Sequence, residues 1–243
     1  MTAPGNRATA EPTPGAGLAA LAGLLADGTR ATMCLALMDG RAWTATELAR
    51  AAGVAASTAT EHLNLLVAGG LLADVRQGRH RYVRLAGPAS AELIESLAAA
   101  SPGAPEPVRS LRAATRRRAL AYARTCYDHL AGAVGVAVTD AMTARGYLSW
   151  ERGLALTEAG ERWLSSLGGW PPATRRQVVR SCMDWTERRP HLGGAAGALL
   201  CRHAIEAGWI VPSTHPRAVR VTDAGRAALR EQLAVPVHVL ATR

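Results

Sequence analysis

The chain has 243 residues, 49% of them hydrophobic, so it is long enough for two domains with their own cores. No apolar run reaches membrane-spanning length and the N-terminus lacks a charged-then-apolar signal pattern, so we expect a cytoplasmic protein. Residues 1–100 carry eight Arg and eight acidic residues, whereas residues 101–243 carry twenty Arg and eleven acidic residues, which places the whole net charge of +9 in the second part.

The first residues predict a tail and two short helices. Residues 1–17 are rich in Pro, Gly, Thr and Ala, and we expect this segment to be disordered. An apolar helix follows over residues 18–26. The pair Asp27-Gly28 then begins a second helix that runs through Met38.

The next stretch has the pattern of a helix that ends in a tight turn. Thr44 can cap the N-terminus of this helix, and Glu47, three residues later, can complete a capping box. Gly53 is the expected end of the helix, because a left-handed backbone costs little without a Cβ atom.

A second helix and a β-hairpin follow this turn. The helix begins near Ser57 and ends at Gly69-Gly70, and two alternating runs over residues 71–76 and 80–85 predict the hairpin. Short polar groups on the helix suit base edges and phosphates, and the basic hairpin tip suits a phosphate backbone. The candidate DNA contacts are Ser57, Thr58, Thr60, His62 and Asn64 on the helix, and Arg76, Arg79, His80 and Arg81 on the hairpin.

Several short motifs succeed one another in this region. They are Leu25-Ala-Asp-Gly-Thr-Arg30, Glu47-Leu-Ala, Ser57-Thr-Ala-Thr-Glu-His-Leu, Gly69-Gly-Leu-Leu and Gly78-Arg-His-Arg-Tyr82. In this order they resemble the ArsR/SmtB family of bacterial transcriptional repressors, over about residues 18–98. The resemblance implies a winged helix-turn-helix domain, a homodimer, repression by binding to an operator in double-stranded DNA, and release by an inducer.

The two metal sites familiar in that family are missing from this sequence. Metal-sensing members carry a cysteine pair on the helix that here contains Glu47, and this helix has no cysteine. Other members use Asp and His ligands on the dimer helix, which here spans about residues 90–100. That helix offers Glu92 and Glu95 but no His, so no metal is assigned and the cofactor stays unknown.

The second part of the chain begins with a Pro-rich linker over residues 101–108 and contains an internal repeat. The segment His129-Leu-Ala-Gly-Ala-Val-Gly135 matches His191-Leu-Gly-Gly-Ala-Ala-Gly197. Farther on, Leu156-Thr-Glu-Ala-Gly160 matches Val221-Thr-Asp-Ala-Gly225, in which the threonines of both segments predict helix N-caps.

This repeat predicts the fold class. We expect a mainly α protein with small β-hairpins, in which a winged helix-turn-helix domain over residues 18–100 precedes a regulatory domain over residues 109–235. Each half of that second domain, about 109–167 and 174–233, is expected to be an αα-hairpin-α unit, similar to a winged helix that has lost its recognition sequence. In this interpretation Cys126 lies on a helix.

A set of polar residues beside the repeated Gly-rich segments is the candidate effector site. Four interpretations stay open: a structural network between the repeats, a metal site, a redox-reactive thiol, and a pocket for an organic ligand. A compact metal-ligand spacing is missing. The set comprises Cys126, Asp128, His129, Cys182, Asp184, Trp185, Arg188 and His191.

The sequence thus predicts a dimeric, sequence-specific DNA-binding repressor that is released by an effector sensed in the C-terminal domain. One alternative is an architectural DNA-binding protein that uses the Arg-rich second half. The other is a ligand- or metal-binding module that acts through protein partners. We expect no enzyme, because phosphate-binding loops, dinucleotide fingerprints and HExxH motifs are missing from the sequence.

Overall fold

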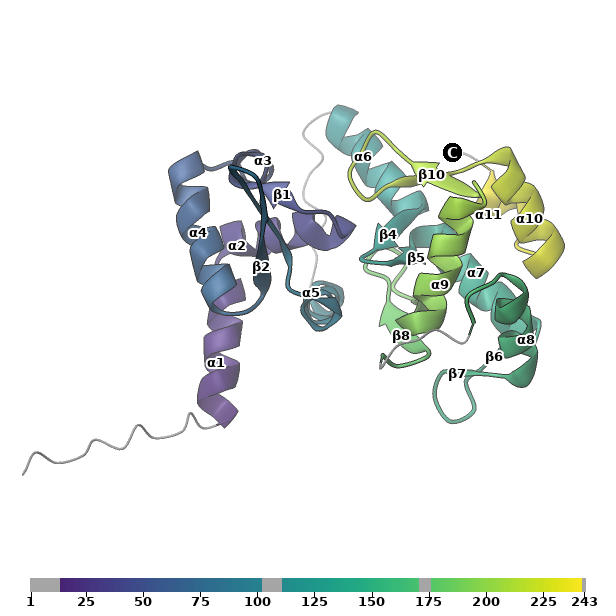
Figure 1. The fold of residues 1–243 in the computed structure, drawn as a ribbon. Coiled ribbons are helices and arrows are strands. Elements are labelled where there is room, and N and C mark those ends of the chain that lie inside the picture. The colour runs from purple at the N-terminus through teal and green to yellow at the C-terminus, as the bar shows by residue number, and fades with distance from the viewer. Residues whose placement is uncertain (1–13, 102–110, 171–175, 242–243) are drawn as a thin grey trace, which may run out of the picture. The chain divides into compact units, whose positions relative to one another are not determined.

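A computed structural model describes residues 14–101, 111–170 and 176–241 (Figure 1). The chain forms two compact units, Met1–Leu37 with Ala42–Ala86, and Met38–Arg41 with Gly87–Arg243. Of the disordered tail expected over residues 1–17, residues 1–13 lie outside the described residues. Residues 14–17 are helical instead. The expected linker over residues 101–108 lies outside them from residue 102 onward.

The first unit combines short helices with a three-stranded antiparallel sheet of strand order β1-β3-β2. A two-residue loop joins β2 to β3, and Gln77 pairs with His80 beside it. The elements are α1 (Pro14–Leu25), α2 (Gly28–Ala36), η1 (Leu37–Asp39, which runs on into the second unit), β1 (Trp43–Thr44), α3 (Ala45–Ala52), α4 (Ala56–Ala68), β2 (Leu72–Gln77) and β3 (His80–Leu85).

Local sequence signals set the ends of α3. The Thr44 side chain accepts a hydrogen bond from the Glu47 N–H, and the Glu47 carboxylate accepts one from the Thr44 N–H, which confirms the predicted capping box. Gly53 closes the helix with a φ of 69°, in the left-handed region where a residue without Cβ is favoured. Buried Leu48 on α3 and Leu63 on α4 then hold the two helices in the core.

The second unit consists of helices and two-stranded hairpins. Within it, α5 packs on β8. The elements are α5 (Pro88–Ala100), α6 (Leu111–Tyr122), β4 (Arg124–Cys126), β5 (His129–Ala131), α7 (Gly132–Ala144), β6 (Leu148–Ser149), β7 (Ala155–Leu156), α8 (Glu158–Ser166), β8 (Arg180–Met183), β9 (Pro190–Gly193), α9 (Gly194–Glu206), β10 (Ile210–Pro212), β11 (Val219–Val221), α10 (Asp223–Leu233) and α11 (Val237–Leu240).

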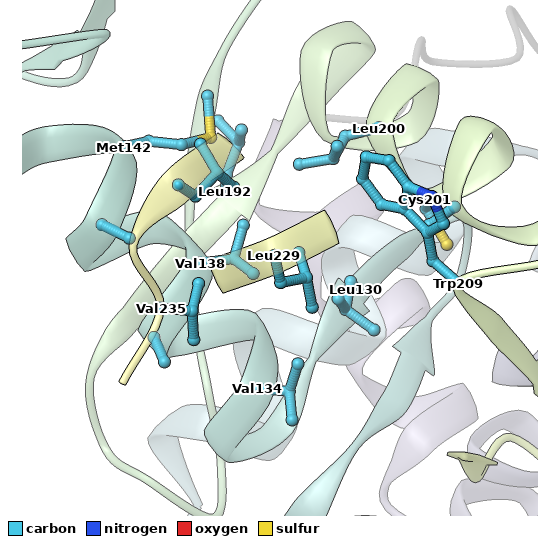
Figure 2. Packing of buried hydrophobic residues seen from close by; sticks show 14 of the residues in the cluster. Leu130, Val134, Val138, Met142, Leu192, Leu200, Cys201, Trp209, Leu229 and Val235 are labelled. Atoms are coloured by element: carbon cyan, nitrogen blue, oxygen red, sulfur yellow. The ribbon is translucent and has the colours of Figure 1, made fainter. Parts of the chain in front are cut away.

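Two consecutive parts of this unit have the same order of elements. Each has a hairpin, a helix, a second hairpin and a second helix, from β4 to α8 and from β8 to α10. The long helices are exchanged between the hairpins, since α7 packs on β9 and α9 packs on β5. Residues from both parts therefore form one apolar core, which includes Val138 of α7, Leu200 of α9 and Leu229 of α10 (Figure 2).

The expected αα-hairpin-α units are wrong in their first part. In the first of the two repeats α6 ends at Tyr122, before Cys126, and the second repeat has strand β8 where its first helix was expected. Pairing between strands outweighs local helix propensity here. The two predicted N-caps are confirmed, since Thr157 and Thr222 cap α8 and α10 by accepting hydrogen bonds from backbone N–H groups.

Helix α5 groups with the second unit, although its sequence was expected to end the DNA-binding domain. Its carboxylate Glu95 is buried within that unit. Among the described residues, no single helix is long and apolar enough to cross a membrane; Gly15–Leu25 and Gly28–Asp39 reach that length only together, across an 81° bend.

Candidate nucleic-acid interface and Cys-His cluster

Helix α4 presents a row of small polar side chains at the surface. Ser57 and Asn64 are exposed, and Thr58 and Thr60 are half-buried. The Thr60 hydroxyl donates to the Ala56 carbonyl, which leaves its lone pairs for another donor. This face offers the hydrogen-bonding groups that base edges and phosphates require.

The wing, which comprises β2, β3 and their loop (residues 72–85), lies beside this helix. The Arg81 guanidinium donates to the Asn64 amide oxygen and to the Asp74 carboxylate, both at 2.8 Å. These bonds join the wing to α4, so Arg81 positions the interface as well as contributing charge. Arg76, Arg79 and His80 are exposed around the tip of the wing, where the His80 ring lies edge-on to Tyr82.

His62 occupies a different position from the other candidates on α4. Its Nδ1 atom lies 3.9 Å from the carboxylate of Asp27, the N-cap residue of α2, and its side chain is 18% exposed. The imidazole is therefore turned toward α2 within the first unit. His62 remains a proposed DNA contact only through the exposed part of its side chain.

The second unit gathers four metal-ligating side chains in one place. Cys126 pairs with His129 across the hairpin β4–β5, and Cys182 pairs with His191 across β8–β9. Because β5 and β9 lie side by side, the two pairs meet, and one sulfur or nitrogen atom of each residue lies within 4.8 Å of all the others. We name these four buried residues the Cys-His cluster.

The sequence pattern alone did not predict this geometry. Cys126 was expected on a helix; it is instead the cross-strand partner of His129 around a two-residue turn. Tyr127 in that turn has a φ of 60°. A bulky residue in the left-handed region is uncommon, and two-residue hairpin turns usually contain Asn-Gly or Asp-Gly. Because Tyr127 stands there instead, the sequence shows no such signal for this hairpin.

Two aspartates flank the histidines of the cluster. The Nε2 atoms of His129 and His191 face each other at 3.1 Å, and the rings stack at a centroid distance of 5.0 Å. On the opposite side of each ring, Nδ1 of His129 lies 3.3 Å from an Asp128 oxygen, and Nδ1 of His191 lies 3.7 Å from an Asp184 oxygen. Both imidazoles therefore have a carboxylate behind Nδ1 and the other imidazole in front of Nε2.

Burial and neighbouring charges set the protonation of this group. Burial disfavours a charged imidazole, but Asp128 and Cys126 outweigh it and raise the pKa of His129. Burial and the adjacent His129 lower the pKa of His191. Burial likewise raises the pKa of the Cys126 thiol well above its usual value.

Asp184 is held by a buried network that the sequence did not predict. Its carboxylate pairs with the Arg124 guanidinium at 2.8 Å, with both side chains 0% exposed, and accepts hydrogen bonds from the Gly132 N–H and the Thr186 hydroxyl. Burial alone would raise the pKa of Asp184, yet Arg124 and these hydrogen bonds keep it well below its usual range.

Glu95 of α5 is a further residue whose role the sequence pattern did not show. The Cys182 thiol donates to a Glu95 carboxylate oxygen at 3.1 Å, and Arg180 forms an ion pair with the same oxygen at 3.1 Å. A hollow of about 310 Å³ between α5 and β8 is lined by these three residues and by Met183. Cys182 is the cluster residue that lines this hollow.

The last two effector candidates lie in the loop between β8 and β9. Trp185 is 41% exposed, and the guanidinium carbon of Arg124 lies 4.7 Å from the centroid of its ring. Arg188 is exposed, and its N–H donates to the Asp184 carbonyl. Both residues therefore support the loop around Asp184 and lie outside the four-residue cluster.

The first unit is similar to known helix-turn-helix proteins. A family model described as a helix-turn-helix domain matches residues 25–75. One similar solved structure is a homodimeric winged helix-turn-helix DNA-binding domain from Mycobacterium bovis, described as a possible ArsR-family regulator. The two sequences are 29% identical, and the match covers 40% of this chain and 86% of the M. bovis chain, with a TM-score of 0.33. The cadmium sensor CmtR from Mycobacterium tuberculosis is 29% identical over 39% of this chain and 99% of its own, with a TM-score of 0.31.

A full-length relative extends the comparison to the second unit. The HTH-type transcriptional regulator YdfF of Bacillus subtilis, itself uncharacterized, is 38% identical over 224 residues, which are 90% of this chain and 98% of YdfF. The similarity therefore includes the Cys-His part of the chain as well as the helix-turn-helix part. The chain belongs to the helix-turn-helix transcriptional regulators, as the motifs between residues 25 and 82 predicted, and its first unit is a winged DNA-binding domain.

Proposed function

We propose that the protein is a dimeric repressor of the ArsR/SmtB type that binds an operator through α4 and the wing. The observation that carries this proposal is the bridge from Arg81 to Asn64, which fixes the wing against the polar face of α4. Exposed Arg76 and Arg79 then extend this surface toward a phosphate backbone. A regulator of this kind acts at the chromosome, which supports the cytoplasm as its location.

A twofold dimer would present two such surfaces to DNA. Two half-sites about 34–36 Å apart, one helical turn, would then form a pseudo-palindromic operator. Support comes from α1, where Leu18 is 69% exposed and lies in a largely apolar helix. Covering this side chain by a second copy would remove apolar surface from water.

The second unit is the proposed regulatory domain, with residues 109–235 as a duplicated structure. The shared order of hairpins and helices in its two parts supports a duplication, as do the matching motifs that begin at His129 and His191. The effector would act where the two parts meet. We assign this role to the Cys-His cluster with Asp128 and Asp184 beside it.

The DNA-binding mechanism is tested by removing one wing arginine. An operator is first selected from random-sequence DNA with the wild-type protein, and its affinity is measured by fluorescence anisotropy at several salt concentrations. Arg79→Ala should weaken binding and lower the slope of log affinity against log salt by about 0.9, because one phosphate contact is lost. Arg162→Ala, which removes the same charge from a side chain 73% exposed in the second unit, is the matched control.

The same measurement separates the architectural alternative. That alternative is favoured by the net charge of +9 in residues 101–243. It predicts that Arg79→Ala leaves the affinity unchanged, that Arg162→Ala weakens binding, and that the selection enriches no common sequence.

Sedimentation of the wild-type protein on the operator should show two chains per site; a single chain would contradict the dimer.

A further inference from the structure

The Cys-His cluster has a donor set that suits one class of metal ion. Two sulfurs and two imidazole nitrogens converge from four different strands, and each side chain is at most 2% exposed. Zinc in proteins takes four such ligands in a tetrahedron, and thiolate with imidazole favours zinc over magnesium or calcium. The distribution of two ligands on each hairpin would make the ion a link between the two parts of the unit.

The distances agree with that geometry to within a small adjustment. Zinc–nitrogen bonds of about 2.0 Å and zinc–sulfur bonds of about 2.3 Å separate the ligand atoms of a tetrahedron by roughly 3.3–3.8 Å. The two Nε2 atoms already lie at 3.1 Å. The widest separation in the cluster is at most 4.8 Å, so closure requires side-chain movements of roughly 1 Å.

The residues behind the histidines fix which nitrogen faces the cluster. A metal-binding imidazole commonly donates its other N–H to a carboxylate, which orients the ring and raises its basicity. Asp128 lies 3.3 Å from Nδ1 of His129 and can accept its hydrogen, whereas the Asp184 oxygen lies 3.7 Å from Nδ1 of His191, which has no hydrogen-bond partner, and would have to move closer to accept one. When both Nδ1 atoms carry hydrogen, the two Nε2 lone pairs point at each other, and only a positive centre between them relieves the repulsion.

We propose that Cys126, His129, Cys182 and His191 bind one zinc ion. Two Zn–S and two Zn–N bonds form; the thiols lose their protons to solvent, and any proton shared by the imidazoles leaves as well. The Cys182 thiol then no longer donates to Glu95. The role of zinc as the effector rests on the proposed function. Zinc binding itself does not, and it is tested without DNA.

The test uses the reduced, chelator-treated full-length protein. Titration with cobalt(II) as a zinc probe should give a thiolate-to-cobalt charge-transfer band and intense d–d bands that saturate at one ion per chain. Zinc should displace the cobalt, and native mass spectrometry should detect a single bound zinc. Cys182→Ser should abolish the charge-transfer band or reduce it strongly, while Cys201→Ala, a change at a core cysteine outside the cluster, should bind cobalt as the wild type does.

The flanking aspartates supply a further readout. Asp128→Asn should weaken zinc binding by about 10- to 100-fold while leaving the four ligands in place. Circular dichroism of each variant separates lost binding from lost folding, and the wild-type titration depends on no variant.

Three results would overturn the proposal. They are a reduced wild-type protein without cobalt bands, a charge-transfer band of wild-type intensity in Cys182→Ser, and bands lost in a folded Cys201→Ala. A purified protein that is lighter by a pair of hydrogen atoms and stays without cobalt bands after reduction would identify Cys126 and Cys182 as a redox pair instead. Loss of operator binding in Arg79→Ala is independent of all these outcomes, so the two proposals can fail separately.

Discussion

At the residue scale, Arg124 and Asp184 form an ion pair with no solvent around it. Both side chains are 0% exposed, and Asp184 also accepts hydrogen bonds from backbone and hydroxyl groups nearby. Removing two charges from water is costly, and full hydrogen bonding at the carboxylate is what offsets that cost. The pair therefore holds the loop after β8, in which Asp184 also accepts hydrogen bonds from the Thr186 and Glu187 N–H groups.

Neutralising this carboxylate should leave an uncompensated guanidinium in the interior. We expect Asp184→Asn to lower the free energy of unfolding of the second unit by about 3–5 kcal/mol. Urea denaturation in chelator and reductant measures the change. The control is Asp140→Asn, whose partner Arg189 is 56% exposed and whose own side chain is 50% exposed, and it should cost at most about 1 kcal/mol. Equal losses in both variants would contradict the role of the buried pair.

At the scale of elements, the first unit follows signals that lie within a few residues of one another. The capping box at Thr44, the left-handed Gly53 and the alternation of the wing each fixed an element end to within about two residues. Thr157 and Thr222 were found in the same way. These signals are local hydrogen bonds and backbone preferences, which a sequence pattern can contain.

The Cys-His hairpins depend on partners far along the chain, and this is why the sequence did not predict them. Strands of three or four residues are too short to show a period. Their stability comes from β5 lying beside β9, about sixty residues away, and from each hairpin packing on the other part's helix. The sequence repeat identified Cys126 and His191 as members of one set, but it could not place Glu95, which reaches the set from a separate helix.

The exchange of helices between hairpins requires a close approach at Gly197 of α9. A Cβ atom there would lie 2.4 Å from the Leu192 carbonyl oxygen and 3.2 Å from Cβ of His129. Gly197→Ala should therefore force the helix away from β9 and lower stability by about 1–3 kcal/mol. In Gly87→Ala a Cβ meets nothing within 4 Å in the same unit, so its effect should stay below about 1 kcal/mol. Thermal unfolding of the two variants tests this, and a stable Gly197→Ala would refute the close contact.

At the scale of the whole molecule, one helix connects the wing to the cluster along the chain. Helix α5 begins three residues after β3 ends, and its Glu95 receives the hydrogen bond of the Cys182 thiol. Two sites are coupled when each ligand favours one arrangement of an element that both sites contact. The Cys182 thiol can donate to Glu95 only while it keeps its proton, so zinc binding as proposed would remove this contact between the cluster and α5.

Zinc should consequently weaken operator binding by the wild-type protein, by about 5- to 150-fold for a coupling typical of regulators. In Glu95→Ala the contact is missing with or without the ion, so the affinity for zinc should persist while its effect on DNA binding disappears. Glu92→Ala, on the same helix and paired with Arg180 at a more exposed position, should respond to zinc as the wild type does. Anisotropy titrations with and without one equivalent of zinc measure all three proteins. If zinc binds to the wild type and leaves its operator affinity unchanged, the ion is a structural link between the hairpins, and a different effector or site controls the release of DNA.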